Sequence, residues 1–492
     1  MSPAAQRSPT VANTPAARGG WLVVVLLGVA AALRLREATR SPQWFDETYS
    51  LWVARLGFPG MMRAIAADIH PPLHFMLLSW WRALGGESDV WLRGSSVVFG
   101  VATVLATWWL ARRAFGAEAG WVAGALLAFH RTHIHFSQEI RFYAMLWLLY
   151  TLAVTAALRW LERGRRGDAA LYVTAVALAF YTHYQSLLVI GCVGLWGAIV
   201  LAREPRRLAA WVGLHAIALV AFLPIAPMFL HQFTQNRDSH WIQPPHPSDV
   251  LTLLRHLSFG AIYLVPPLLA LAALPLFRGD AVHRRRASLL WTFAFLPIAI
   301  SYLLTARGGH LYAERYMFFA LPAWCVLIAA GFASLPWRQL RVVAALGLVG
   351  LAARSWALSE PYAEAVELGR AASGVAARVQ PGDVVFSADT HSLLFFMQYL
   401  PHAARYRLLL TQPGLPYYEG AVFIPDSIRA TPAQFDSVRA AGRAWWGVHA
   451  RHAGIDTRPA LELLKTHATT IEHPGRIVTV VYGQGDSSAA GP

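Results

Sequence analysis

Length, composition and charge exclude an ordinary soluble protein. The chain has 492 residues, of which 56% are hydrophobic and only 14% are charged, whereas soluble domains carry about 25% charged residues. The formal net charge is +15, but the arginines lie in short segments between apolar runs. A soluble domain with a basic stripe is missing, so the charge does not indicate nucleic-acid binding. Two cysteines, Cys192 and Cys325, are too few for a disulfide framework.

Apolar runs near the ~20 residues needed to cross a bilayer recur along most of the chain. They predict a polytopic α-helical membrane protein with about eleven transmembrane helices, of which those at 117–130 and 169–184 are short and either tilted or partly re-entrant. The N-terminus could be a cleavable signal peptide, but a retained first helix is favoured because no small-residue cleavage site lies between the apolar stretch 21–33 and Arg34 and Arg36. The runs are 21–38, 91–112, 117–130, 142–160, 169–184, 186–202, 208–230, 257–277, 287–306, 316–334 and 339–356.

The arginines between these runs predict the orientation of the helices. Loops rich in lysine and arginine stay in the cytoplasm, so alternate connections and the N-terminus are expected on the cytoplasmic side. The other connections then face outward, and every polar cluster described below falls on that side. The arginines are Arg112, Arg113, Arg163, Arg165, Arg166, Arg203, Arg206, Arg207, Arg278, Arg284, Arg285, Arg286, Arg338 and Arg341.

The first outward loop, residues 39–90, begins with two adjacent acids in "WFDETY". An acid at the bilayer edge is partly desolvated, which raises its pKa and makes it a stronger base where a partner keeps it ionised. Asp46 and Glu47 are therefore candidate catalytic residues, and the alternative is a pair of helix-end charges among the headgroups. Later in this loop, "PPLHFMLLSWWRALG" is too short to cross the membrane and is typical of an interfacial helix.

Further outward clusters carry candidate substrate-binding groups. In "ADIHPPLHF" two prolines hold Asp68 and His70 on a rigid turn, which is equally compatible with a plain entry into the next helix. A guanidinium at the interface suits a phosphate, so Arg141 and Arg315 are candidate donor-phosphate ligands, although Arg141 also fits a snorkelling helix anchor. The candidate substrate-binding residues are Asp68, His70, Glu139, Tyr143, His183 and Tyr316.

Histidines gather at His130, His133 and His135, which raises the question of a metal. No H-E-x-x-H or similarly constrained spacing accompanies them. No cofactor and no metal ligand is therefore predicted, and a divalent metal stays as the alternative to a polar rim of neutral histidines.

From about residue 357 the composition changes, and no further span-length run follows. Short β-branched stretches ("DVVFS", "AVFIP", "IVTVVYG") alternate with helical ones at 362–378, 432–441 and 458–466, which predicts a small α/β domain on the outward side. Thr431 is a plausible N-cap before Pro432. The predicted domains are a disordered N-terminus (1–18), a transmembrane domain (19–356), the α/β domain (357–482) and a disordered tail (483–492).

The ordered series of motifs over about residues 20–335 resembles the bacterial membrane glycosyltransferases of the family 39, protein-mannosyltransferase-like group, within the glycosyltransferase C superfamily. The Asp-Glu pair alone is weak, but its order with the other motifs is fairly specific. These motifs are "DIHPPLHFMLL", "RGSSVVFGVATVLATWWLARRAFG", "SQEIRFYAM", "YTHY" and "ERYMFFALP".

The resemblance implies an inverting transfer of a sugar from a polyprenyl-phosphate donor in the bacterial inner membrane. Relatives use mannose or another hexose, or an aminoarabinose for lipid A, and the sequence does not select one of them. The resemblance also implies that Asp46 is the general base, that Glu47 orients the acceptor or supports Asp46, and that Arg141 with Arg315 neutralises the departing phosphate. The acceptor hydroxyl on the extracytoplasmic face belongs to a cell-envelope glycan, a glycolipid or a protein. The long 231–256 loop and the C-terminal domain are both candidates for holding it.

Other functions are compatible with parts of this pattern. A transporter or flippase of a lipid-linked sugar predicts mid-membrane charges and inverted repeats, and neither is clear in the sequence. A binding or assembly protein that works through the C-terminal domain leaves the outward acids and arginines without a purpose. An inactive transferase kept as a scaffold is disfavoured by the intact pair of Asp46 and Glu47.

Overall fold

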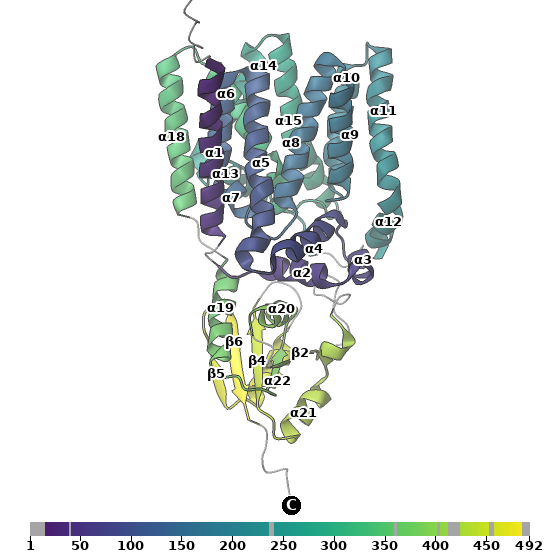
Figure 1. The fold of residues 1–492 in the computed structure, drawn as a ribbon, viewed down its shortest axis with the longest axis vertical. Helices are drawn as coiled ribbons and strands as arrows, with labels where there is room; N and C mark the ends of the chain where they lie inside the picture. Colours follow the sequence, from purple (N-terminus) through teal and green to yellow (C-terminus); the bar gives the residue numbers. More distant parts are fainter. Residues whose placement is uncertain are drawn as a thin grey trace, which may run out of the picture.

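The fold is described from a computed structural model, which places a helical bundle above a small sheet domain (Figure 1). It describes residues 15–38, 41–235, 241–358, 362–400, 404–411, 424–451 and 457–484. The predicted disorder at residues 1–14 and 485–492 lies outside the described residues. Helix α1 already begins at Pro15, inside the segment predicted to be disordered.

A helix occupies every apolar run that the sequence predicts, and these helices stand side by side as a bundle (Figure 1). The segment Glu314–Ala333, which ends in α17, forms its centre, since 94% of its most apolar stretch is buried, whereas only 11% of that of α18 is buried and α18 lies at the edge. The helices are α1 (Pro15–Glu37), α5 (Asp89–Phe115), α6 (Ala117–Phe129), α8 (Tyr143–Arg163), α9 (Arg166–Phe180), α10 (Ser186–Val200), α11 (Pro205–Phe222), α14 (Val265–Arg278), α15 (Ala281–Thr305), α17 (Leu321–Ala333) and α18 (Arg338–Ala357).

The predicted count of about eleven membrane spans is not confirmed. Within the part of the chain that the structure describes, six helices are long and apolar enough to cross a membrane. A seventh results if α13 and α14, which are bent by 81° at their break, count as one span. Helices such as α6 and α10 are apolar but have only 13 and 15 residues, and an apolar run alone does not show how much of a bilayer its helix crosses.

Of the shorter helices, α2, α3 and α4 lie across one end of the bundle, whereas α12 continues the line of α11 and α16 leads into α17 (Figure 1). α4 is a helix at the place where the sequence predicts an interfacial one; Pro72 precedes its first residue and a glycine with positive φ, Gly86, ends it. The short helices are α2 (Phe45–Arg55), α3 (Phe58–Ala66), α4 (Leu73–Gly85), α7 (Arg131–Phe136), α12 (Ala226–Gln235), α13 (Pro247–Leu257) and α16 (Glu314–Met317).

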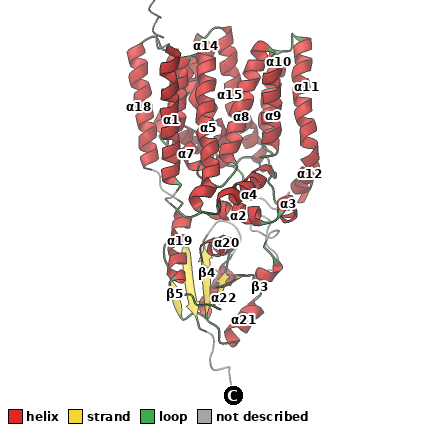
Figure 2. Cartoon of the chain, viewed as in Figure 1, coloured by secondary structure: helices red, strands yellow, loops and turns green. Residues whose placement is uncertain are grey.

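All described strands lie in the C-terminal domain, as Figure 2 shows in yellow. They form one sheet of order β3-β2-β1-β4-β6-β5, in which β3, β2, β1 and β4 are parallel and β6 and β5 are antiparallel additions. The elements are α19 (Ala363–Ala376), β1 (Val384–Ser387), α20 (Thr390–Tyr399), β2 (Arg405–Leu409), β3 (Arg429–Ala430), α21 (Pro432–Ala440), β4 (Trp445–Ala450), α22 (Arg458–Thr466), β5 (Thr470–Glu472) and β6 (Val478–Gly483).

Helices cover both faces of this sheet because successive side chains of a strand point to opposite sides. Trp445 packs in one core with Phe435 of α21, and its neighbour Trp446 packs in the other core with Leu368 of α19. The predicted strands "DVVFS" and "IVTVVYG" are β1 and β6, and Thr431 caps α21 as expected. The predicted strand "AVFIP" lies mostly outside the described residues.

The sheet domain docks directly beneath α2. The ring of His391, in the first turn of α20, stacks on Phe45 at 3.7 Å. The hydroxyl of Tyr399 donates to Asp89 at 2.6 Å and accepts from the backbone N–H of Gln43 at 2.7 Å. These contacts bring the C-terminal domain to the end of the bundle that carries Asp46.

Candidate active site

The carboxylate of Asp46 lies between two guanidinium groups. Its Oδ2 is 3.1 Å from Nη1 of Arg315 and 3.7 Å from Nε of Arg141. Asp46 stands in the first turn of α2, Arg141 just before α8, and Arg315 in α16 immediately before α17. Three segments that are distant in the sequence thus form one cluster, called here the charge triad (Asp46, Arg141 and Arg315).

The surroundings of Asp46 keep it ionised. Burial raises the pKa of its carboxyl, but the charges of Arg141 and Arg315 lower it by more, so the pKa lies below its usual value. The expectation that the pKa of Asp46 is raised is therefore wrong, although burial is the largest single influence on it. One carboxylate against two guanidiniums leaves the charge triad with an excess of positive charge, and such a site attracts an anion.

Arg141 is fixed by groups from two neighbouring elements. Its Nη1 donates to Oγ of Ser50 at 3.1 Å, and its Nη2 lies 3.3 Å from Nε2 of His70. A guanidinium only donates, so Nε2 of His70 accepts and its Nδ1 carries the proton, which it donates to Asp68 at 2.8 Å. The predicted residues Asp68 and His70 are thus brought to the site, where they orient Arg141.

Glu47 has a different place from its neighbour. Its side chain is 1% exposed, and it pairs with Arg93 of α5 at 2.7 Å. Its oxygens also accept from the backbone N–H of Ile140 at 3.0 Å and from that of Trp44 at 3.2 Å. Both oxygens are occupied, so the predicted contact of Glu47 with an acceptor is not supported. Glu47 is a positioning residue that ties α2 to α5 and to the turn that carries Arg141.

Aromatic rings enclose the charge triad on the bundle side. The ring of His183 lies 4.7 Å from those of Phe142 and Tyr316, and Tyr143 lies 6.4 Å from Tyr316. The guanidinium of Arg315 also lies 4.3 Å from the ring centre of Trp241. The predicted residues Tyr143, His183 and Tyr316 are therefore beside the triad, where they lower the local dielectric and strengthen its charges.

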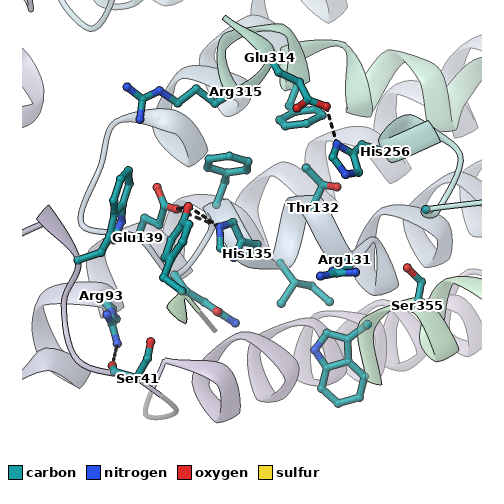
Figure 3. A pocket seen from close by; sticks show the side chains of 18 of the residues that line it. Ser41, Arg93, Arg131, Thr132, His135, Glu139, His256, Glu314, Arg315 and Ser355 are labelled. Atoms are coloured by element: carbon teal, nitrogen blue, oxygen red, sulfur yellow. Dashed lines mark hydrogen bonds and ion pairs between the residues drawn. The ribbon is translucent and has the colours of Figure 1, made fainter. Parts of the chain in front are cut away.

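A cavity of about 430 Å³ opens beside Arg315, and we call it the polar cavity (Figure 3). Glu139 belongs to this cavity and not to the charge triad. Figure 3 shows it near His135 in the middle, with Arg93 and Ser41 on one side and Glu314 with His256 on the other. A second cavity of about 480 Å³, lined by Trp241 and Asp249, also reaches Arg315. Arg315 thus stands where two cavities meet.

Several residues of the site were missed from the sequence. Arg93 is one of many arginines, and nothing local marks it as the partner of Glu47. Tyr362, from the start of the C-terminal domain, reaches the polar cavity, and the sequence gives no signal for it. Trp44 lines the polar cavity as well. It is part of the "WFDETY" motif, but an aromatic residue at this position does not by itself predict that it lines a cavity.

Among the residues that the structure describes, no three His, Cys, Asp or Glu side chains lie close enough together to hold a metal ion. His133 instead pairs with Arg34 at 2.6 Å, and Nε2 of His130 lies 3.3 Å from the carbonyl oxygen of Leu257. These histidines bind neighbouring protein groups. The absence of a cofactor stays a prediction.

Comparison with known proteins gives one family match. Residues 69–231 match the family model of dolichyl-phosphate-mannose-protein mannosyltransferase. No curated protein matches the chain.

Two solved structures share the fold over nearly the whole chain. ArnT from Cupriavidus metallidurans in the apo state is 16% identical with a TM-score of 0.65, and the match covers 97% of this chain and all of that one. The same protein bound to undecaprenyl phosphate is 15% identical with a TM-score of 0.63, over 96% of this chain and 99% of that one. At these identities the likeness shows the fold.

The family match and the motifs thus agree on one class of protein. Residues 69–231 are thus similar to the protein-mannosyltransferase family, as the motifs predict, and the fold over nearly the whole chain is that of the two ArnT structures. The six helices of the described chain that are long and apolar enough to cross a membrane make it a multi-pass membrane protein.

Proposed function

We propose that this protein transfers a hexosyl group from a polyprenyl phosphate to a hydroxyl group, with inversion at the anomeric carbon and with Asp46 as the general base. The observation that carries the proposal is the charge triad, which holds one ionised carboxylate between two fixed guanidiniums. ArnT bound to undecaprenyl phosphate supports a lipid phosphate as the carrier. The family description makes mannose the first hexose to test.

The donor changes the state of Asp46 when it binds. A phosphodiester carries one negative charge, which balances the excess positive charge of the charge triad. As Arg141 and Arg315 turn their donors to the phosphate, Asp46 loses part of its stabilisation and its pKa rises. The carboxylate becomes a stronger base only once the donor is in place.

The transfer is then a single displacement. The acceptor oxygen attacks the anomeric carbon while its proton passes to Asp46, and the bond between that carbon and the phosphate oxygen breaks on the opposite face. The electron pair of the broken bond leaves with the polyprenyl phosphate, which gains a negative charge. Arg141 and Arg315 stabilise that charge, so the leaving group needs no proton.

The reaction is placed on the extracytoplasmic face of the bacterial inner membrane. The acceptor is a hydroxyl of an envelope glycan, a glycolipid or a protein. Support for this side comes from the arginine-rich starts of α11 and α18, which lie at the end of the bundle away from the sheet domain (Figure 1).

Transfer of radiolabelled sugar tests the proposal directly. The purified protein in lipid is given polyprenyl-phosphate hexoses, mannose first, together with a crude envelope extract. Asp46→Asn removes the base and is expected to lower transfer 10²–10⁴-fold, the usual effect of a general base. Asp436→Asn, at an exposed carboxylate of α21, is the control and leaves transfer unchanged.

Two results would contradict the proposal. Full activity of Asp46→Asn shows that another group takes the proton. Absence of transfer by the wild type, together with movement of the lipid-linked sugar across liposome membranes, replaces the transferase by a flippase. Addition of a chelator in the same assay tests the prediction that no metal is needed.

A further inference from the structure

Four residues that line the polar cavity each carry an unpaired polar atom. Nε1 of Trp44, Nε2 of Gln138, Oε2 of Glu139 and Nε of Arg315 are all buried and have no hydrogen-bond partner among the described residues. All four residues line this one cavity. Buried polar atoms in native proteins are almost always paired, and leaving one unpaired costs about 1–3 kcal/mol. Four such atoms around one cavity indicate that a ligand supplies their partners.

A residue of the C-terminal domain binds one of the two carboxylate oxygens of Glu139 and not the other. The hydroxyl of Tyr362, just before α19, donates to Oε1 of Glu139 at 2.7 Å. His135 lies 2.8 Å from the same hydroxyl and 3.1 Å from the same Oε1. Oε1 is thus fully engaged, while Oε2 has no partner within the described chain. Tyr362 fixes the carboxylate so that one oxygen is left for a ligand.

The same cavity has aromatic walls. The ring of Tyr362 packs on that of Trp44 with centroids 4.7 Å apart, and on that of His135 at 4.9 Å. Phe136 and Phe318 line the cavity as well. A few directed polar groups among aromatic side chains suit a compact polar ligand with apolar faces.

The polar atoms also define the charge of the ligand. Three donors (Trp44, Gln138 and Arg315) and one carboxylate acceptor match hydroxyl groups, which both donate and accept. The charged side chains that line the cavity balance, with three carboxylates (Glu47, Glu139, Glu314) against three guanidiniums (Arg93, Arg131, Arg315), so the cavity favours a neutral ligand. Arg315 belongs both to this cavity and to the charge triad, so the ligand lies next to the place where the donor phosphate binds.

We infer that the polar cavity binds the sugar ring of the donor, that Oε2 of Glu139 accepts its hydroxyls, and that Tyr362 of the C-terminal domain is the residue that positions Glu139. This inference rests on the proposed function, since it takes the lipid phosphate to lie at Arg141 and Arg315. It makes the C-terminal domain a structural part of the sugar site.

Comparing the affinities for two lipids that differ only in the sugar distinguishes the sugar site from the phosphate site. The probes are undecaprenyl phosphate and undecaprenyl-phosphate mannose, and their affinities for the full-length protein in lipid are measured by a fluorescence or scintillation assay. Glu139→Gln and Tyr362→Phe are expected to weaken binding of the mannosyl lipid about tenfold, the usual effect of losing a hydrogen bond to a charged group. Binding of undecaprenyl phosphate stays unchanged.

Tyr399→Phe is the matched control. Tyr399 is the second tyrosine whose hydroxyl joins the C-terminal domain to the bundle, through Asp89 and Gln43, and it does not line the polar cavity. If loss of a hydroxyl merely loosened the contact between the domains, Tyr362→Phe and Tyr399→Phe would change lipid binding alike. If Tyr362 belongs to the sugar site, only Tyr362→Phe weakens binding of the mannosyl lipid. Tyr399→Phe is therefore expected to bind both lipids like the wild type.

Three results would overturn the inference. The first is that Glu139→Gln loses affinity for both lipids equally. The second is that Tyr362→Phe and Tyr399→Phe change the affinities equally. The third is that the wild type binds none of the mannosyl, glucosyl and galactosyl lipids more tightly than undecaprenyl phosphate. A wild type that binds a hexosyl lipid selectively but transfers no sugar keeps the sugar site and rejects the proposed catalysis. The two failures are thus distinguishable.

Discussion

At the scale of single residues, the charge triad determines how activity depends on pH. Burial raises the pKa of the Asp46 carboxyl, but Arg141 and Arg315 lower it by more. The acid limb of the kcat/KM profile, which reports the free enzyme, is therefore expected below the ordinary aspartate pKa of about 4. Arg141→Gln removes one of the two cations, so the pKa rises and the limb moves to higher pH.

This prediction is checked by the position of the limb and not by its height, because Arg141→Gln also weakens phosphate binding. Arg378→Gln, at an exposed arginine of the C-terminal domain, leaves the limb in place. A limb that stays at the same pH in Arg141→Gln shows that Asp46 is not the group whose protonation stops the reaction.

The sequence predicts those residues whose chemistry is unusual for their place. An ionised Asp46 or Arg315 at the edge of a membrane is costly unless it has a task, so both stand out. Tyr362 does not, because its role depends on a contact with Glu139 across 223 positions of the chain. The pairing of Glu47 could not be predicted for a related reason, since its partner Arg93 lies 46 positions away.

At the scale of elements, the buried pair of Glu47 and Arg93 holds α2, α5 and the turn before α8 together. Glu47→Gln leaves the charge of Arg93 buried without a counter-charge, and breaking such a pair costs about 3–5 kcal/mol. The variant is expected to unfold at a clearly lower temperature in lipid nanodiscs. Glu472→Gln breaks an exposed pair with Arg378, both about two-fifths exposed, and such pairs contribute about 0–1 kcal/mol.

Similar small shifts in both variants would show that water reaches Arg93 and replaces its partner. The comparison therefore tests whether α2, which carries Asp46, is anchored by this one pair. The unfolding temperature measures stability and not catalysis, and the exposed control pair lies on the C-terminal domain, away from α2.

Helix positions are readable from apolar runs because hydrophobic length is a local property of the sequence. The number of spans is not, because α6 and α10 are shorter than the ~20 residues of a full crossing. In the C-terminal domain, the strands β1 and β6 follow from β-branched runs. Their places in the sheet depend on which faces the helices cover, and that is decided by packing between distant segments.

At the scale of the whole molecule, the sheet domain is expected on the extracytoplasmic side, because the arginine-rich connections at the opposite end stay in the cytoplasm. Single cysteines test this. Ser437→Cys places a thiol on an exposed position of α21, and Gly167→Cys places one beside Arg165 and Arg166. The native thiols of Cys192 and Cys325 are both buried, so they give little background labelling.

A membrane-impermeant maleimide added to intact spheroplasts is expected to label Ser437→Cys at once, and to label Gly167→Cys only after the membrane is permeabilised. The opposite pattern would place the charge triad, which lies beside the sheet domain, on the cytoplasmic face. The donor sugar would then have to be presented on the inner leaflet. Because the triad and Tyr362 lie at the same end of the molecule, this one measurement fixes the side on which the proposed transfer takes place.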